Sequence, residues 1–300
     1  MYYNIARGNI ARGCELCLLG AKAVIFITGL CRYRCFYCPV DRERFGRDVV
    51  YVNDVPAKTV EEVVELVASS AAVGAAITGG DPLDVVERVA AVANALKKAL
   101  GKSFHIHLYT RATSLNSLAV SRLAGAVDEV RLHLISRGEV VRKERYIEAL
   151  RSLGVSVGVE VPAVPGLERS IAEAINYLAE RGLIEFVNIN ELDASEANIP
   201  SLLAMGFRVR DGHVVGSFES AKKLMELIRG VPVHICRSKS KDLFQIGARL
   251  FRDSMAEAAP AELVLDDGSV EYAEEGVHPN SPLARSIRVK VRLGGKTLES

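Results

Sequence analysis

Three cysteines in one short segment have the clearest chemical meaning in this sequence. Cys31, Cys35 and Cys38 lie in the string Cys-Arg-Tyr-Arg-Cys-Phe-Tyr-Cys, with CxxxCxxC spacing. Thiolates are the ligands of iron–sulfur clusters, and a four-iron cluster normally takes four of them. Three thiolates leave one iron open, as a catalytic metal requires. Zinc usually takes paired CxxC spacing, and three buried free thiols in one loop are uncommon, so the spacing predicts a catalytic 4Fe–4S cluster.

A second set of soft ligands lies outside this segment. Cys14 and Cys17 form a CxxC pair, and His234 and Cys236 alternate along a predicted strand and so share one face. Together they make a Cys3His set, which suits a structural zinc ion or an auxiliary iron–sulfur cluster. The alternatives are a redox pair, a place for Cys236 near the active site, or buried thiols with no metal.

The number and crowding of the cysteines favour metal over disulfides. The chain has six cysteines, and five of them lie between positions 14 and 38. In a cytosolic chain of this length, such crowding is typical of metal binding.

The elements that must position these residues alternate between strands and helices. Buried β-branched runs predict strands at about 23–27, 75–78, 104–109, 129–134, 155–161 and 184–189. Helical periodicity predicts helices at about 59–73, 84–100, 114–124, 139–152, 168–181 and from about 195. Thr59 and Glu62 form a capping box at the first of these helices. Six successive βα units with right-handed crossovers predict a parallel sheet, open barrel or doubly wound. The regular spacing, without a nucleotide fingerprint, favours an α/β fold with a partial (β/α)6 TIM-like barrel.

The last third of the chain is less regular. We expect a hairpin at 209–215, a helix at 218–229, a strand at 231–236 and a basic helix at 240–258. Short strands at 263–265, 270–272 and 287–293 predict a small C-terminal β appendage. The predicted division is therefore an N-terminal arm with the CxxC pair (1–22), the barrel with its extension (23–258) and the appendage (259–300).

A basic stripe runs from position 237 to position 252. Its members are Arg237, Lys239, Lys241, Gln245, Arg249 and Arg252. A solvated helix face is the more common meaning of such a stripe, and binding of a phosphate-bearing substrate or RNA is the alternative.

Polar residues gather at the predicted strand ends. Parallel barrels carry active sites at the carboxyl ends of their strands, which is where the cysteine segment begins. The second strand ends in Thr78-Gly79-Gly80-Asp81, and alternation gives the third strand a face with His105, His107 and Tyr109. Arg131 and His133 share a face of the fourth strand, and Asn188 and Asn190 share a face of the sixth, before Glu191. The alternatives are a helix cap for Asp81, satisfied polar groups in the barrel interior, and loop capping.

The cysteine segment, with Tyr37 just before Cys38, resembles the signature of the radical S-adenosylmethionine superfamily. The resemblance implies that the open iron chelates the amino and carboxyl groups of S-adenosylmethionine. Reductive cleavage would then give methionine and a 5′-deoxyadenosyl radical, which abstracts hydrogen from a substrate.

Further segments extend the resemblance. Thr78 to Asp81 is similar to the superfamily's Gly-Gly-Glu motif, which binds the amino group of S-adenosylmethionine, with Asp81 one methylene shorter. Gly154 to Glu160 is similar to the strand-five motif whose glycine and acid border the adenine and ribose. An archaeal group described as related to pyruvate formate-lyase activating enzymes is resembled over about 14–250, through the strings Thr28 to Cys31, Thr78 to Leu83, His105 to Thr110 and Asn188 to Leu192.

These patterns give one set of expected site residues. The predicted cofactor-binding residues are Tyr37, Thr78, Gly79, Gly80, Asp81, Tyr109, Arg131, His133, Glu160 and Asn188. The predicted cofactors are a 4Fe–4S cluster and S-adenosylmethionine, with zinc or a second cluster at the Cys3His set. The implied partners are an electron donor such as ferredoxin or flavodoxin, and a small-molecule, protein or RNA substrate.

Composition sets outer limits on these predictions. The chain has 300 residues, a net charge of +1, 49% hydrophobic and 25% charged residues, so no global charge attracts nucleic acid or anionic membrane. It has no run of 18 apolar residues and no apolar segment near Met1, and we expect a cytoplasmic protein with no membrane contact. The alternative function is a non-catalytic zinc or iron–sulfur redox protein, or an RNA-binding protein with a zinc clamp. Neither of these would cleave S-adenosylmethionine.

Overall fold

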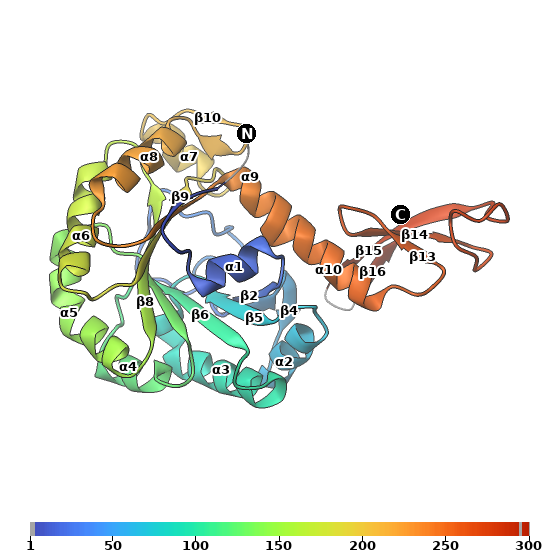
Figure 1. Cartoon of the computed structure of the whole chain (residues 1–300), viewed down its shortest axis with the longest axis horizontal. Helices are drawn as coiled ribbons and strands as arrows, with labels where there is room; N and C mark the ends of the chain where they lie inside the picture. Colours follow the sequence, from blue (N-terminus) through green and yellow to red (C-terminus); the bar gives the residue numbers. More distant parts are fainter. Residues whose placement is uncertain (1–3, 294–295, 300) are drawn as a thin grey trace.

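The computed structural model describes residues 4–293 and 296–299 and shows an open α/β barrel with a small appended sheet (Figure 1). Seven strands run parallel in the order β12-β9-β8-β7-β6-β5-β2. They are β2 (Lys22–Phe26), β5 (Gly74–Thr78), β6 (His105–Thr110), β7 (Glu129–Leu132), β8 (Ser156–Ala163), β9 (Phe186–Glu191) and β12 (Val233–Cys236). The predicted fold class is confirmed, and β12 adds a seventh parallel strand to the six predicted βα units.

Antiparallel strands border the parallel sheet on both sides. β1 (Ile5–Arg7) pairs with β12, and the hairpin of β3 (Val50–Val52) and β4 (Val55–Ala57) pairs with β2. The chain turns between β3 and β4 at Asn53 and Asp54, with φ of 46° and 71°. In the described part of the chain β1 and β4 do not pair with each other, so the barrel stays open along one side.

Helices cover the outside of the barrel (Figure 1). They are α2 (Val60–Ala68), α3 (Val86–Leu100), α4 (Ser117–Leu123), α5 (Arg137–Ser152), α6 (Glu168–Glu180) and α8 (Ser217–Leu227). Side chains such as Ile77, Ile106 and Val159 are fully buried in one continuous core. The strands are therefore apolar towards the helices, and polar side chains are left for the barrel interior.

The boundaries of the predicted helices are close to the observed ones. The capping box is confirmed, because Thr59 Oγ1 accepts from Glu62 N at 3.2 Å and Glu62 Oε2 accepts from Lys58 N at 2.7 Å. The predicted end at residue 73 is wrong, because α2 stops at Ala68. The hydroxyls of Ser69 and Ser70 donate to carbonyl groups of the last turn, which competes with further helix.

The N-terminal arm contains a helix that the sequence patterns do not predict. α1 (Arg12–Leu18) lies inside the ring of strands and packs against β2, β5 and β6 (Figure 1). It has only seven residues, and its N-cap, Ala11, makes no side-chain cap, so it shows neither periodicity nor a start signal. Packing of the buried Leu16 beside Gly74 at the start of β5 places α1 towards the amino ends of the strands.

The C-terminal third adds connecting elements and the appendage. After β9 come α7 (Ile199–Ala204) and a two-stranded sheet of β10 (Val209–Arg210) and β11 (His213–Val214). The predicted basic helix is a continuous run of α9 (Ser238–Ser240), the π-helix η2 (Lys241–Gly247) and α10 (Ala248–Glu257).

The appended sheet projects away from the barrel (Figure 1). It is antiparallel and consists of β13 (Glu262–Val264), β14 (Ser269–Ala273), β15 (Ile287–Leu293) and β16 (Lys296–Glu299). The division of the chain at residues 22 and 258 stays a prediction. Over residues 4–293 and 296–299, none of the helices combines the length and the apolar character that crossing a bilayer needs.

Candidate active site

A cavity of about 440 Å³ lies at the carboxyl ends of the strands, and we call it the mouth cavity. Most of the predicted site residues line it: Cys31, Cys35, Cys38, Tyr37, Thr78, Gly79, Gly80, Tyr109, Arg131, His133 and Glu160. They come from the cysteine loop and from the ends or interior faces of β5 to β8. The structure therefore brings together residues that the sequence separates by more than a hundred positions.

The start of the cysteine loop is fixed by backbone contacts. Gly29 N donates to Arg47 O at 2.8 Å, and Gly46 N donates to Gly29 O at 2.7 Å. A Cβ atom on Gly29 would lie 1.7 Å from the carbonyl oxygen of Arg44, so only glycine fits here. This packing holds the chain just before Cys31.

An ion pair beside the loop adds to this support. Arg88 contacts both carboxylate oxygens of Asp48, at 2.6 and 2.7 Å, and Asp48 Oδ1 accepts from Thr28 Oγ1 at 2.9 Å. Arg88 also donates to the carbonyl of Ile27 at the end of the first parallel strand. Both ends of the loop from Thr28 to Asp48 are thereby tied to the barrel.

Aromatic and amide contacts fix the far side of the cysteine loop. Phe36 stacks on Phe207 with ring centroids 5.8 Å apart and planes 5° apart. Asn198 Nδ2 donates to the carbonyl of Tyr37 at 3.0 Å, and Tyr37 is itself 6% exposed. The segment after β9 therefore holds the loop in place over the strand ends.

Tyr37 and His133 form a polar contact inside the mouth cavity. The Tyr37 hydroxyl lies 2.9 Å from His133 Nε2. Burial, and next the charge of Arg111, lower the pKa of His133 to about 4, and burial raises the pKa of Tyr37. The histidine is thus neutral at neutral pH and the phenol keeps its proton, so the contact is a hydrogen bond between two neutral groups.

The three cysteines of the loop fit an iron–sulfur cluster. Each is half-buried, and burial raises the pKa of Cys31 and Cys38. Within the described residues, no group of these thiols has all its sulfur atoms within 4.8 Å of one another. In a cluster each thiolate binds a different iron, so the three sulfur atoms need not converge on one point. The soft donor set and the adjoining cavity are those that such a cluster needs.

The two glycines after β5 are required by close chain approach. Gly79 has φ of 143°, and a Cβ atom there would lie 2.2 Å from Thr28 O. A Cβ atom on Gly80 would lie 2.1 Å from Leu30 O, and Gly80 N donates to Thr28 O at 2.8 Å. The glycines therefore let the end of β5 pack against the backbone that leads into Cys31, and they also line the mouth cavity.

Asp81 is placed as a helix cap. It is 1% exposed and is absent from the lining of the mouth cavity. Its Oδ1 accepts from Thr110 Oγ1 at 2.6 Å and from Leu83 N at 3.3 Å, at the start of the 3₁₀ helix η1 (Pro82–Val85). This geometry favours the capping alternative over direct contact between the Asp81 carboxylate and a cofactor.

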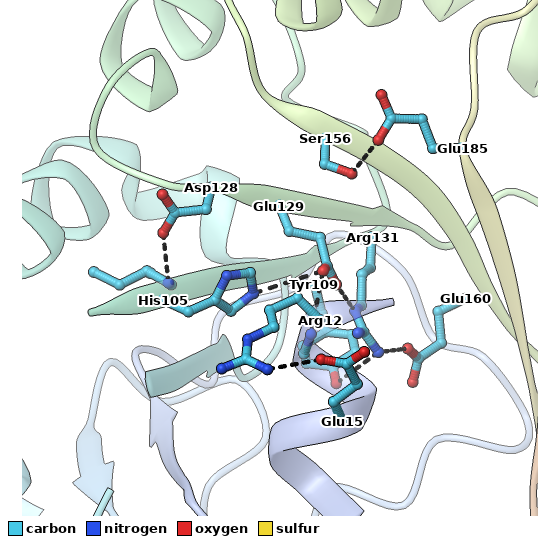
Figure 2. Close-up of polar contacts among 12 residues, drawn as sticks. Arg12, Glu15, His105, Tyr109, Asp128, Glu129, Arg131, Ser156, Glu160 and Glu185 are labelled. Atoms are coloured by element: carbon cyan, nitrogen blue, oxygen red, sulfur yellow. Dashed lines mark hydrogen bonds and ion pairs between the residues drawn. The ribbon is translucent and has the colours of Figure 1, made fainter. Parts of the chain in front are cut away.

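A buried ionic network forms the inner wall of the barrel (Figure 2). Arg131 is 2% exposed and lies between Glu129, with Nε–Oε1 at 2.5 Å, and Glu160, with Nη1–Oε2 at 2.6 Å. Burial alone would raise the pKa of Glu129, but the Arg131 charge holds it at about 2. Asn190 Nδ2 donates to the other oxygen of Glu160 at 2.8 Å. The charges of this network are thus largely compensated by one another.

The predicted second set of ligands surrounds a separate, smaller cavity of about 40 Å³, which we call the inner cavity. It is lined by Cys14, Cys17, His234, Cys236 and the predicted cofactor residue Asn188, none of which lines the mouth cavity. Burial raises the pKa of Cys14 to about 11 and that of Cys236 to about 12. The structure therefore places these residues around one cavity, and their role as metal ligands stays a prediction.

Another set of possible ligands, outside the inner cavity, has its ligand atoms closer together. In the described part of the chain, the one group with ligand atoms within 4.8 Å of one another is His105, His107 and Glu129. It lies where the first residues of β6 and β7 face α1, and Gly13 N donates to Glu129 Oε2 at 3.3 Å. The four possible ligands of the inner cavity thus line one cavity, but their ligand atoms do not all lie within 4.8 Å of one another.

Several lining residues were missed by the sequence patterns or interpreted differently. Lys22 is 4% exposed and lines both cavities. The sequence feature that could have indicated it is its position directly before a buried apolar run. Lys241 forms an ion pair with Asp193 at the mouth cavity. Arg249 is 7% exposed. The solvated-face interpretation of the basic stripe is therefore wrong at Lys241, which is paired at the cavity, and at Arg249, which is buried.

Comparison with known proteins gives the family. The model described as the Radical SAM superfamily matches residues 25–229. A protein of Methanocaldococcus jannaschii, provisionally named a glycyl-radical enzyme activating enzyme, is 37% identical over 275 residues, which cover 87% of this chain and 72% of the relative.

Two solved structures are also similar. One is Streptococcus suis SuiB, at 13% identity and a TM-score of 0.46, with 59% of this chain and 41% of SuiB covered. The other is the radical S-adenosylmethionine methyltransferase TsrM of Kitasatospora setae with tryptophan substrate and a cofactor analogue bound. Its identity is 14% and its TM-score 0.44, with 90% of this chain and 59% of TsrM covered. The chain thus spans less than two thirds of either solved chain.

Proposed function

The chain belongs to the radical S-adenosylmethionine superfamily, and from this premise we propose that it cleaves S-adenosylmethionine reductively at the mouth cavity and removes a hydrogen atom from a substrate. One observation carries the proposal. The three thiols of the family's spacing line a single cavity of about 440 Å³ at the carboxyl ends of parallel strands, where barrel enzymes have their active sites.

The cysteine loop supplies the metal ligands in this proposal. Cys31, Cys35 and Cys38 would hold a 4Fe–4S cluster and leave one iron open for the amino and carboxyl groups of S-adenosylmethionine. When bound, such a cluster supplies the electron that splits S-adenosylmethionine into methionine and a 5′-deoxyadenosyl radical. The backbone contacts of Gly29 at the start of the loop, and the contacts of Phe36 and Asn198 on its far side, keep the three thiols at the cavity.

Other residues of the mouth cavity position and shield the reactants. The Tyr37–His133 hydrogen bond fixes an aromatic ring at the cavity wall without adding a charge. Gly79 and Gly80 bring backbone, rather than side chains, to the wall beside the thiols. Leu192 and Pro162 add apolar surface that limits the access of water to a radical.

The substrate we propose is a glycine residue of a partner protein. The supporting observation is the 37% identical relative, whose provisional name is that of a glycyl-radical enzyme activating enzyme. The 5′-deoxyadenosyl radical would take one hydrogen atom from the glycine Cα, giving 5′-deoxyadenosine and a glycyl radical. The electron would come from a ferredoxin or flavodoxin. The RNA alternative has less support, because Lys241 and Arg249 of the basic stripe are turned inward.

Cleavage is tested with anaerobically reconstituted full-length protein, dithionite and S-adenosylmethionine, with 5′-deoxyadenosine measured by chromatography. We expect product from the wild type and at least a ~100-fold loss in Cys31→Ala/Cys35→Ala/Cys38→Ala. Ser121→Ala, an exposed change on α4, is the control and keeps full activity. Absence of 5′-deoxyadenosine from wild type with a full iron content would contradict the proposal.

The substrate is tested separately. A purified glycyl-radical enzyme labelled with 2,2-dideuterated glycine is added to the same assay. We expect deuterium in the 5′-deoxyadenosine and a glycyl-radical signal in electron paramagnetic resonance. Continued cleavage without deuterium transfer would reject this substrate and leave the cleavage reaction in place.

A further inference from the structure

We propose that Cys14, Cys17, His234 and Cys236 bind a zinc ion at the inner cavity, separate from the metal of the mouth cavity. The four residues come from the two ends of the barrel domain, α1 and β12, and line one cavity of about 40 Å³. Three thiolates and one imidazole are a ligand set typical of structural zinc.

α1 presents its two cysteines on one side. Cys14 and Cys17 are three residues apart, so their side chains lie on the same helix face, and Cys14 is buried. The intervening Glu15 points elsewhere and forms an ion pair with Arg12 at 2.7 Å, as Figure 2 shows. The cysteine face of α1 is therefore directed to the barrel interior.

β12 presents its two ligands on the interior face of the sheet. His234 and Cys236 alternate along the strand, so they share a face, and they pair in register with Asn188 and Asn190 of β9, which also line the inner cavity. His234 is 4% exposed, and within the described residues neither of its ring nitrogens has a hydrogen-bond partner. An unpaired buried imidazole is costly, and a metal ion in the inner cavity would satisfy one nitrogen.

The size of the inner cavity favours one ion over a cluster. The inner cavity is only about 40 Å³, and a four-iron cluster would add four irons and four sulfides to it. The mouth cavity, at about 440 Å³, has room for the larger group.

The charges around the inner cavity suit a thiolate-bound ion. Zinc with three thiolates and one neutral imidazole carries a net charge of −1. Lys22 lines the same cavity. Lys241, Arg131 and Glu160 also line it, but Lys241 is paired with Asp193, and Arg131 is paired with Glu160. Lys22 therefore supplies the positive charge that complements the centre that we propose.

Binding of the ion would draw the four ligand atoms closer together, and side-chain rotation contributes to this closure. The four ligand atoms are not gathered within 4.8 Å in the described structure, but a change of one χ1 rotamer moves a cysteine sulfur by about 3 Å. Cys17 at present donates to Gln245 Oε1 at 3.7 Å, a weak contact that zinc ligation would replace.

The group of His105, His107 and Glu129 is a competing place for an ion. Its carboxylate is already bonded to Arg131 at 2.5 Å, so a divalent cation there would lie against the guanidinium charge. Arg131 also contacts the Cys14 thiol, so what separates the two groups is the softer donor set of the three thiols, which zinc prefers.

The test removes the mouth thiols first, so that any remaining metal belongs elsewhere. Full-length Cys31→Ala/Cys35→Ala/Cys38→Ala protein is prepared without metal under reducing conditions and titrated with zinc, and with Co²⁺ as a spectroscopic probe. We expect one zinc per chain, and with Co²⁺ the absorption bands of tetrahedral thiolate ligation. Adding Cys14→Ser/Cys236→Ser should weaken zinc binding by at least ~100-fold, and adding His234→Ala by about 10–100-fold. Glu15→Gln on the exposed side of α1 is the matched control and keeps the affinity of its parent.

Three results would overturn the proposal. One is the absence of stoichiometric zinc and of Co²⁺–thiolate bands in the folded triple-alanine protein, a readout that does not depend on the folding of any inner-cavity variant. Another is iron with inorganic sulfide, instead of zinc, in the triple-alanine protein after reconstitution. The third is zinc that survives Cys14→Ser/Cys236→Ser and is lost with His107→Gln, which would place the ion on the competing group.

Discussion

The mouth cavity and the inner cavity each contain three cysteines, but they hold them in different ways. At the mouth, half-buried thiols lie on an irregular loop beside a cavity of about 440 Å³. At the inner cavity, thiols on a helix and a strand surround about 40 Å³. A catalytic metal needs an open position and room for substrate, whereas a structural metal is enclosed by its ligands. Cysteine number alone therefore does not separate the two roles, but the elements and the volume around the thiols do.

The two cavities are connected through the barrel interior. Tyr109, Arg131, Glu160 and Asn190 line both of them. Because this wall is shared, a change in the ionic network can affect the two cavities together, whereas a change in the cysteine loop should affect only the mouth. The predictions below use this difference.

The largest effect should come from a mouth thiol. Cys35→Ala is expected to lower 5′-deoxyadenosine formation by more than ~10³-fold, about 4 kcal/mol in activation free energy. The free energy of unfolding of the apoprotein should change by less than about 1 kcal/mol, because Cys35 is half-buried on a loop. Product assays and denaturant unfolding measure the two quantities. Large losses of both in Cys35→Ala would remove the contrast between the cavities.

The shared ionic network should have the next largest effect. Arg131→Met leaves Glu129 and Glu160 buried without their cation, and we expect a loss of about 3–5 kcal/mol in the free energy of unfolding. The matched control is Arg122→Met, which breaks an exposed ion pair with Glu87 and should cost less than about 1 kcal/mol. Equal effects of the two substitutions in urea unfolding would show that the network is not a structural element.

A pH effect should follow from the buried histidine of the mouth. The pKa of His133 is lowered to about 4 in the folded protein, with Tyr37, Arg111 and Glu160 as its polar or charged neighbours. The unfolded chain therefore binds a proton first as pH falls. The contribution of neutral His133 to the free energy of unfolding is complete above pH 6.5 and is lost between about pH 6.5 and 4. At 1.36 kcal/mol per pKa unit, the loss reaches about 3 kcal/mol.

Comparison of two histidine variants measures this effect. The free energy of unfolding of His133→Gln should vary less with pH over that range than the wild type, while His213→Gln, on the β10–β11 hairpin, should keep the wild-type dependence. Parallel pH curves for all three proteins would contradict the assignment.

Much of the barrel could be predicted because strands that are buried on both faces have continuous apolar sequences. Ala23 to Ile27 and Ala75 to Ile77 are such runs, and the second is fully buried, whereas Val24 and Phe26 of the first are only partly buried. The helix α1 and the π-helix η2 could not be predicted, because one is too short for periodicity and the other depends on packing. The β3–β4 hairpin had a turn signal at Asn53-Asp54, but its strands have only three residues each.

The site was predictable where covalent spacing decides the position, and less so elsewhere. Cys31, Cys35 and Cys38 are close in sequence and must share a location, and Gly79 and Gly80 follow a strand end. The placement of Asp81 as a cap and of Asn188 at the inner cavity depends on side-chain direction and strand register. Those properties are fixed by tertiary packing, which local sequence does not contain.

The smallest effect that still separates the cavities should come from Tyr37→Phe. The substitution removes the hydrogen bond to His133 Nε2 and leaves the ring and its contact with Phe36. We expect a loss of about 0.5–1.5 kcal/mol in the free energy of unfolding, because a partly buried hydrogen bond is lost. The KM for S-adenosylmethionine should rise a few-fold, and zinc binding at the inner cavity should not change. Tyr51→Phe, on the outer hairpin, is the control without effect on KM. If Tyr37→Phe altered zinc affinity and not KM, the Tyr37–His133 pair would act through the shared wall rather than at the mouth.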